Sequence, residues 1–242
     1  MIKQSLANKD HATKKPPHGV RALWSLACLL ALIPLVSVHL AYAVSIAQGT
    51  APACVPYWQG CTSISAAARN GWANHLFKLS MLPYTSLLFG YWWLCAAWLR
   101  QLVPARRRRR RRHAMLACGT VGAVFLALYI EFLGVEGDTY RWLRRYGINL
   151  YFSGTVLAQM LLASLLVGEP RVSNHIQRGW LILCGLLLGL GLASLPLQFV
   201  VDDRRRLLNA IEWLYALLMV TAYPLTGYAW RATGFSLRPE VR

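Results

Sequence analysis

Charge is scarce in this chain, and negative charge is scarcer still. Charged residues make up 14% of its 242 residues, and only 9 residues are Asp or Glu, whereas hydrophobic residues make up 56%. This composition argues against an ordinary soluble domain and favours an integral membrane protein. A run of about 20 apolar residues crosses a hydrocarbon core of roughly 30 Å. Nearly uncharged runs of this kind occur at about 22–46, 77–99, 114–133, 149–168, 180–200 and 209–230.

The short alternating segments that a membrane β-barrel requires are absent from the sequence. Without water at that depth, backbone polar groups must pair within each apolar run, and this favours helices. We therefore predict an all-α integral membrane protein in which residues 22–230 form a bundle of six transmembrane helices. The polar, basic residues 1–21 are predicted to be a disordered cytoplasmic tail, and residues 231–242 a second cytoplasmic tail.

Basic residues are divided unevenly between alternate loops. Of the 26 Lys and Arg residues, 18 lie in 1–21, 100–113, 169–179 and 231–242, and 8 lie in the loops between them. Because cytoplasmic loops carry the excess, both termini are predicted to be cytoplasmic. Seven of the 18 form one run, from Arg106 to Arg112, in a short connector. Despite the formal net charge of +17, such a run indicates anionic lipid as its partner rather than nucleic acid, and it is typical of a bacterial inner membrane protein.

Metal-binding cysteine motifs are also missing. No CxxC or Cys/His spacing occurs, so neither a metal nor a cofactor is predicted. Cys54 and Cys61 share the first outer loop, where an oxidising compartment would allow a disulfide between them. The alternative is two unpaired loop cysteines. The remaining four, which fall in the cytoplasmic halves of their helices, are predicted to be free thiols: Cys28, Cys95, Cys118 and Cys184.

Two outer loops carry local signals of structure. In the first, residues 47–76, tryptophans favour the membrane interface, and Ser63 or Ser65 is expected to cap a short helix. In the second, residues 134–148, the mixture of charged and aromatic residues around Trp142 predicts a short interfacial helix. Small residues at i and i+4 also predict close helix packing, both at Gly154 with Ala158 and along the fifth apolar run, which contains Gly185, Gly189 and Gly191.

Few ionisable residues lie within the apolar runs, and these are the candidate site residues. Glu212, Glu131 and His39 all fall toward the predicted outer leaflet. An ionisable group in hydrocarbon costs a few kcal/mol or more, so it is a functional-site hypothesis by default. A desolvated carboxyl group at Glu212, working with Glu131 or His39, could transfer protons. Alternatively, these carboxylates are interfacial and pair with the arginines of the outer loops.

Three more polar residues stand at the mouths of apolar runs: His75, Lys78 and Asn149. His75 and Lys78 are one turn apart and therefore share a helix face. Cationic groups at that depth suit a lipid headgroup phosphate, so we predict that His75 and Lys78 bind a lipid headgroup. A serine nucleophile is not predicted, because no GxSxG motif surrounds Ser63 or Ser65.

Several stretches of sequence together resemble the Frag/DRAM/Sfk superfamily. CVPYW at 54–58, followed by SISAA at 63–67, is similar to a signature between its first two helices. NLYF at 149–152 is similar to its fourth helix, and AIEW at 210–213 with TGY at 226–228 to its sixth, including the Glu near the start. The resemblance covers roughly half the chain.

This resemblance implies a six-helix membrane protein concerned with lipid composition. The branch that it matches contains the post-GPI-attachment factors (CWH-type N-terminal domain), which exchange fatty acids on an anchor lipid in the lumenal leaflet. Members of that branch tend to have a His late in the sixth helix, where this chain has Tyr223 and Pro224. The long arginine run moreover suggests a bacterial member, and bacteria have no GPI anchor, so that substrate is not carried over to this chain.

Three functions follow as expectations. The first is a multi-pass protein of lipid homeostasis that binds, and in the stronger form remodels, a lipid of the outer leaflet. The second is a non-enzymatic membrane-organising or regulatory protein whose polar residues fix helix packing. The third is a small transporter, which is disfavoured because the inner halves of the helices carry almost no ionisable residues and no inverted repeat is evident.

Overall fold

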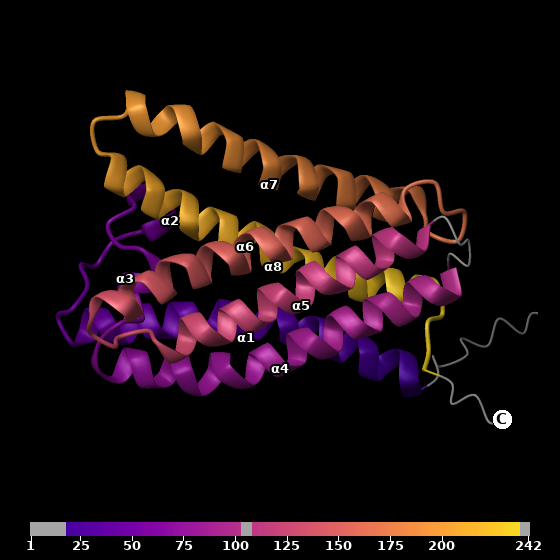
Figure 1. Ribbon diagram of the computed structural model, residues 1–242, viewed down its shortest axis with the longest axis horizontal. Helices are drawn as coiled ribbons and strands as arrows, with labels where there is room; N and C mark the ends of the chain where they lie inside the picture. Colours follow the sequence, from indigo (N-terminus) through magenta and orange to yellow (C-terminus); the bar gives the residue numbers. More distant parts are fainter. Residues whose placement is uncertain (1–17, 103–107, 238–242) are drawn as a thin grey trace, which may run out of the picture.

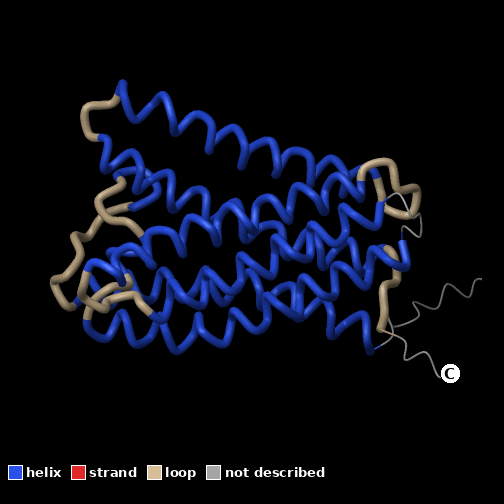
Figure 2. The backbone as a smooth tube through the Cα atoms, in the orientation of Figure 1, coloured by secondary structure: helices blue, strands red, loops and turns tan. Residues whose placement is uncertain are grey.

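The computed structural model describes residues 18–102 and 108–237 and contains only helices and loops within them (Figures 1 and 2). Among these residues six helices are long, and two short ones lie between the first and second long helices. In chain order they are α1 (His18–Ala47), α2 (Pro56–Gln59), α3 (Ile64–Ala67), α4 (Gly71–Leu102), α5 (Arg109–Glu131), α6 (Asp138–Leu166), α7 (Asn174–Val200) and α8 (Arg204–Ala232).

Five of the long helices are long and apolar enough to cross a membrane: α1, α5, α6, α7 and α8. The protein is therefore an all-helical, multi-pass membrane protein. The predicted second span corresponds to α4, which has 32 residues, carries His75 and Lys78 near its start and is not among these five. It packs against both α1 and α5 and runs alongside the other long helices (Figure 1).

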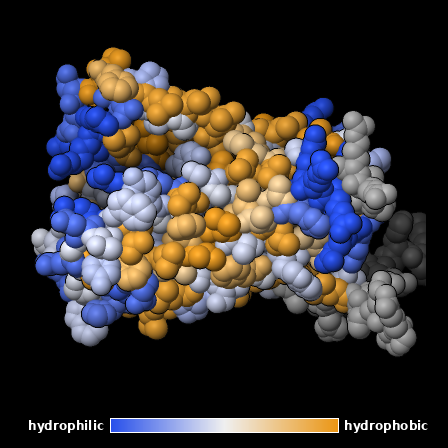
Figure 3. Space-filling model, viewed as in Figure 1, coloured by the Kyte–Doolittle hydropathy of each residue, from blue (hydrophilic) through white to orange (hydrophobic). Residues whose placement is uncertain are grey.

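The two ends of the bundle differ in structure. One end, which we call the capped end, carries α2, α3 and the turns at 132–137 and 201–203 (Figures 1 and 2). Both ends of the described chain, at residues 18 and 237, lie at the opposite end. A space-filling view shows an apolar band between two polar ends, as expected of a membrane-spanning bundle (Figure 3).

Parts of the predicted tails, residues 1–17 and 238–242, lie outside the described residues. So do the first two residues of the arginine run, Arg106 and Arg107. Arg108 lies at the opposite end from α2 and α3, and its guanidinium donates a hydrogen bond to the carbonyl oxygen of Leu165 (3.2 Å).

Helix boundaries depart from the prediction mainly at the capped end. The separate interfacial helix expected around Trp142 is wrong, because these residues form the first turns of α6, which starts at Asp138 rather than near 149. The loop predicted at 201–208 is likewise mostly helical, since α8 begins at Arg204 with Asp203 as its N-cap. Charged residues had indicated loops at both places, but they occupy exposed helix faces. The short helix expected after Ser63 is present as α3, and Ser63 caps it by accepting the N–H of Ala66 (3.0 Å).

Close packing of α5 against α6 depends on small residues. A Cβ atom at Gly154 would lie only 2.9 Å from the carbonyl oxygen of Cys118, and Ala158 is fully buried. This part of the small-residue prediction is confirmed. The prediction for α7 is wrong at Gly185 and Gly189, whose missing side chains would face open space. The face of α7 that carries these two glycines does not contact the neighbouring helices.

Candidate functional site

The capped end is built around a disulfide-bonded loop. Cys54 and Cys61 form the predicted disulfide, with α2 between them. Trp58 and Trp72 are 89% and 69% exposed, as expected of side chains that would anchor the loop at a membrane interface. Tyr42, from α1, holds the loop from below, because its hydroxyl donates to the carbonyl oxygen of Cys54 (3.0 Å).

Helix α8 fastens this loop through a row of hydrogen bonds. The side-chain amide of Asn209 donates to the carbonyl oxygen of Gly60 (2.8 Å), and the indole N–H of Trp213 donates to the carbonyl oxygen of Thr62 (2.9 Å). Between them along α8, the carboxylate of Glu212 accepts the main-chain N–H of Ser65 (3.4 Å). The row therefore sets where α3 and Ser65 lie relative to α8.

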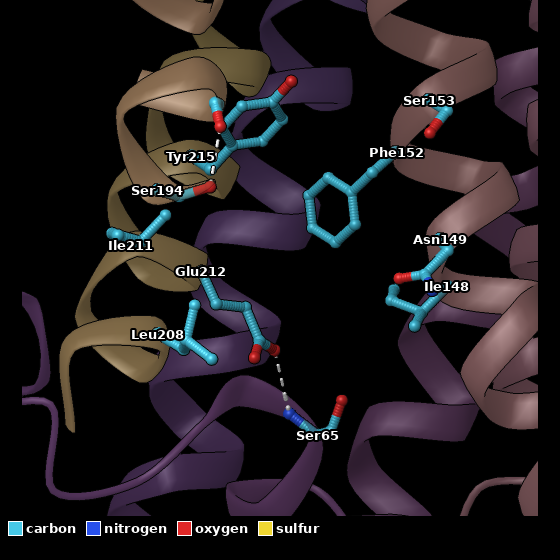
Figure 4. Close-up of a pocket in the computed structure, with 11 residues that line it drawn as sticks. Ser65, Ile148, Asn149, Phe152, Ser153, Ser194, Leu208, Ile211, Glu212 and Tyr215 are labelled. Atoms are coloured by element: carbon cyan, nitrogen blue, oxygen red, sulfur yellow. Dashed lines mark hydrogen bonds between the residues drawn. The ribbon is translucent and has the colours of Figure 1, made fainter. Parts of the chain in front are cut away.

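Beside this row lies a cavity of about 370 Å³, which we call the groove (Figure 4). Residues from α3, α6, α7 and α8 line it: Ser65, Ile148, Asn149, Phe152, Ser153, Gly191, Ser194, Leu208, Ile211, Glu212 and Tyr215. Its volume is at the low end of the usual range for small-molecule sites, roughly 300–1,000 Å³. The molecular surface is hollowed beneath α7 near the capped end (Figure 3).

The groove has an apolar wall and a polar floor. Phe152 packs edge-on against Tyr215, with ring centroids 5.7 Å apart, and these rings form much of the wall. The partly buried Glu212 extends its carboxylate toward Ser65 at the floor (Figure 4). An amphipathic ligand fits such a combination, because apolar contact supplies affinity and a few polar groups fix its orientation.

A second cavity, of about 300 Å³, adjoins the groove, and we call it the arginine pocket. Its lining consists of Ser65, Arg69, Tyr129, Leu133, Arg141, Arg144, Arg145 and Ile148. Ser65 and Ile148 line both cavities and so mark their boundary. At that boundary the buried Tyr129 donates a hydrogen bond from its hydroxyl to Oγ of Ser65 (2.8 Å).

The arginines of this pocket have different partners. Arg144 donates to the carbonyl oxygens of Phe132 (3.1 Å) and Val135, and so holds the turn between α5 and α6. Arg141 forms an ion pair with Asp138 (3.3 Å), in which both side chains are largely exposed.

His39 belongs to a different cluster from Glu212. Its Nδ1 is 2.7 Å from the carbonyl oxygen of Leu35, which can only accept a hydrogen bond, so Nδ1 is the protonated ring nitrogen. Its Nε2 therefore accepts from the hydroxyl of Tyr57 (3.0 Å), and burial raises the pKa of that phenol above its ordinary value. Trp213 lies edge-on to both rings. His39 thus joins α1 to α2 and does not line the groove.

Glu131, His75 and Lys78 also lie at the capped end but line neither cavity. The ammonium group of Lys78 donates to the main-chain carbonyl oxygen of Glu131 (2.8 Å), and the Glu131 side chain is exposed. His75 is exposed and packs edge-on against Trp72, with ring centroids 5.9 Å apart. No group of three His, Cys, Asp or Glu side chains that could hold a metal ion occurs in residues 18–102 or 108–237.

The sequence reasoning missed Ser65 as a lining residue and the whole arginine pocket. One signal was present, because Arg141, Arg144 and Arg145 have the i, i+3, i+4 spacing of a single helix face. That signal was lost because the segment was interpreted as a loop.

Comparison of the chain with protein-family models, with curated proteins and with solved structures finds no match.

Proposed function

We propose that this protein crosses the membrane six times and binds a membrane lipid in the groove. In this proposal α4 is the sixth crossing, both termini are cytoplasmic, and the capped end faces the outside of a bacterial inner membrane. The uneven distribution of basic residues supports this orientation. The Cys54–Cys61 disulfide supports it independently, because disulfides persist on the oxidising side of a membrane.

The observation that carries the lipid-binding proposal is the position and lining of the groove. It lies at the capped end, between helices that are apolar enough to span a membrane, and it combines aromatic and aliphatic walls with a carboxylate and hydroxyl groups. A lipid of the outer leaflet has matching parts, because its acyl chain would contact the apolar walls and its headgroup the polar groups. The resemblance to the Frag/DRAM/Sfk superfamily adds lipid homeostasis as the biological setting.

Acyl-chain remodelling is the stronger form of this proposal. Within the groove, Glu212 is the carboxylate that could accept or donate a proton, and Ser65, whose main-chain N–H it accepts, carries a hydroxyl group in the same lining. The roles expected for His39 and Glu131 in proton transfer are not part of the proposal, because neither lines the groove. His75 and Lys78 are likewise replaced as the headgroup-binding residues.

The experiment is lipid mass spectrometry on purified protein with a matched pair of glycine substitutions. Gly191→Leu places a side chain in the groove, where a Cβ atom would meet Tyr215 at an ordinary 3.8 Å, whereas Gly185→Leu points into open space on the same helix. Each methylene of the lipid's acyl chain that loses its apolar contact costs about 0.8 kcal/mol of binding free energy. A leucine side chain that displaces two or more methylenes should therefore lower the amount of lipid retained roughly tenfold. The proposal fails if both variants retain the same lipids as the parent.

A second candidate function is a membrane-organising protein in which Glu212 has only a structural role. The specific observation that favours it is the row of hydrogen bonds from α8, in which Glu212 holds the main chain of Ser65 as Asn209 and Trp213 hold their own partners. Glu212→Ala would then lower thermal stability while the retained lipids stay those of the parent. Glu131→Ala is the matched control, because that carboxylate is exposed and lies outside the groove.

A further inference from the structure

The arginine pocket concentrates positive charge where the groove ends. Three of its arginines come from the first turns of α6, and the fourth, Arg69, follows α3. No Asp or Glu is among the described residues that line it. Arg69 and Arg141 are close enough to Arg144 for their charges to repel. Solvent screens part of this repulsion at the exposed arginines, and an anion between the guanidinium groups would relieve the rest.

The protein itself offsets little of this charge. Asp138 pairs with Arg141, but that pair is exposed, and Arg144 binds carbonyl oxygens, which leave its charge uncompensated. In the part of the chain that the structure describes, Arg69 and Arg145 form no ion pair. Three cationic side chains therefore face this pocket without a carboxylate at ion-pair distance, and Glu212, in the adjoining groove, is close enough to attract Arg69.

Guanidinium groups bind phosphate especially well, because their N–H groups donate paired, charge-assisted hydrogen bonds to its oxygens. A phosphate monoester carries about −1.5 to −2 charges near pH 7 and would offset most of the excess. A phosphodiester carries one charge and would offset less. The charge in the pocket thus favours a terminal phosphate.

The shared boundary at Ser65 and Ile148 connects this anion site to the apolar groove. Because Oγ of Ser65 accepts the Tyr129 proton, the O–H of Ser65 is left to donate to a ligand that passes from one cavity to the other. The geometry points to a lipid with a phosphate monoester headgroup, bound with its phosphate in the arginine pocket and an acyl chain in the groove. This inference rests on the proposed function, because it names the class of lipid that the groove receives.

The test is titration of the full-length protein in detergent with phosphatidic acid, phosphatidylglycerol and phosphatidylcholine of identical acyl chains, followed by native mass spectrometry. We expect phosphatidic acid to bind tightest, roughly tenfold or more above phosphatidylcholine. Replacing Arg69 and Arg145 together by Gln should remove most of that preference and leave the binding of phosphatidylcholine within about twofold. Arg144 is left intact, because it also holds the α5–α6 turn.

The control is replacement of Arg204 and Arg205 together by Gln. These arginines are exposed at the same end of the bundle but line neither cavity, so general attraction to anionic lipid changes equally in both double variants. Equal loss of phosphatidic acid binding in the two would overturn the inference. So would equal affinity of the parent for the three lipids.

Two further arms separate the possible ligands and the possible failures. Inorganic phosphate at millimolar concentration should not displace phosphatidic acid; if it does, with the same dependence on Arg69 and Arg145, the pocket serves a soluble phosphate.

Gly191→Leu should weaken the binding of all three lipids. If it does so while the parent shows no headgroup preference, the groove stands as a lipid site and only the phosphate assignment fails. If it affects none of the lipids, the proposed function fails as well.

Discussion

Glu212 and Ser65 are 147 positions apart in the chain, yet the Glu212 carboxylate accepts the main-chain N–H of Ser65 at 3.4 Å. The contact belongs both to the floor of the groove and to the row of hydrogen bonds that holds the disulfide loop on α8. A substitution at Glu212 therefore changes two properties, the position of the loop and the chemistry of the groove. Variants must be chosen to separate them.

Glu212→Gln and Glu212→Ala should make this separation. The amide oxygen of Gln can still accept the N–H of Ser65, so we expect the free energy of unfolding of this variant to lie within about 1 kcal/mol of the parent's. Ala leaves the N–H without its partner and should be destabilised by roughly 1–2 kcal/mol more than Gln. Thermal unfolding followed by the fluorescence of the 10 tryptophans measures the difference. Identical melting temperatures for Gln and Ala would show that the hydrogen bond does not position the loop.

Gly60→Ala should be much more damaging than Gly49→Ala. Both glycines have positive φ, +56° and +68°, which strains any residue with a Cβ atom. Only at Gly60 would that atom also collide with a neighbour, since it would lie 1.8 Å from the carbonyl oxygen of Arg206. We expect the free energy of unfolding to fall by about 1 kcal/mol for Gly49→Ala. For Gly60→Ala we expect a fall of at least about 3 kcal/mol, because the loop must move off α8.

Limited proteolysis of the first outer loop provides the second measurement for this pair. The Gly60→Ala variant should be cleaved between α1 and α4 under conditions in which the parent and the Gly49→Ala variant stay intact. Equal protection of the two variants would mean that the docking of the loop on α8 tolerates a side chain at position 60, contrary to the geometry.

Much of the fold could be predicted because hydropathy is a local property. Each of the six apolar runs corresponds to one long helix, and four lie wholly within theirs, whereas the runs at 114–133 and 149–168 extend two residues past the ends of α5 and α6. The main departure is that α6 starts about three turns earlier than expected. That error arose at Arg141 and Arg144, whose charge was interpreted as a loop signal although the residues are helical. The glycines also show that local sequence does not reveal which residues contact a neighbouring helix. Gly154 and Gly185 occur in similar patterns, but only the neighbouring helix decides which of them is in close contact.

The candidate site was harder to predict because it is assembled from distant segments. Glu212 could be found from its apolar neighbours alone. Ser65 could not, since its importance comes from Tyr129, 64 positions away, and from Glu212. Lys78 and His75 were expected to bind a headgroup from their one-turn spacing, but spacing does not reveal that neither residue lines the groove or the arginine pocket.

Cysteine chemistry should distinguish two of the six cysteines from the other four. Alkylation of unreduced, denatured protein should modify Cys28, Cys95, Cys118 and Cys184, and reduction should expose Cys54 and Cys61 as well. Replacing both bonded cysteines by Ser should lower stability by on the order of 2 kcal/mol, because the short loop gains conformational entropy when unfolded. Six reactive thiols without reduction would contradict the disulfide.

The six-span topology predicts which positions a membrane-impermeant maleimide reaches in intact cells. Asn70→Cys, between α3 and α4, and Asp202→Cys, between α7 and α8, place thiols at exposed positions of the capped end. His113→Cys and His175→Cys place them at exposed positions near the starts of α5 and α7, which begin at the opposite end (Figure 1). The first two should react in intact cells, and the other two only after permeabilisation. The parent is the blank, because Cys54 and Cys61 are bonded to each other.

Residues 70 and 113 test α4 in particular, since they precede and follow it along the chain. If both react from the same side of the membrane while 175 and 202 react from opposite sides, α4 does not cross, and five spans remain. That result would be difficult to reconcile with the packing of α4 against both α1 and α5, and with the full burial of Tyr84 and Tyr91 between helices. We therefore expect opposite labelling at 70 and 113, which would place the groove and the arginine pocket at the outer leaflet.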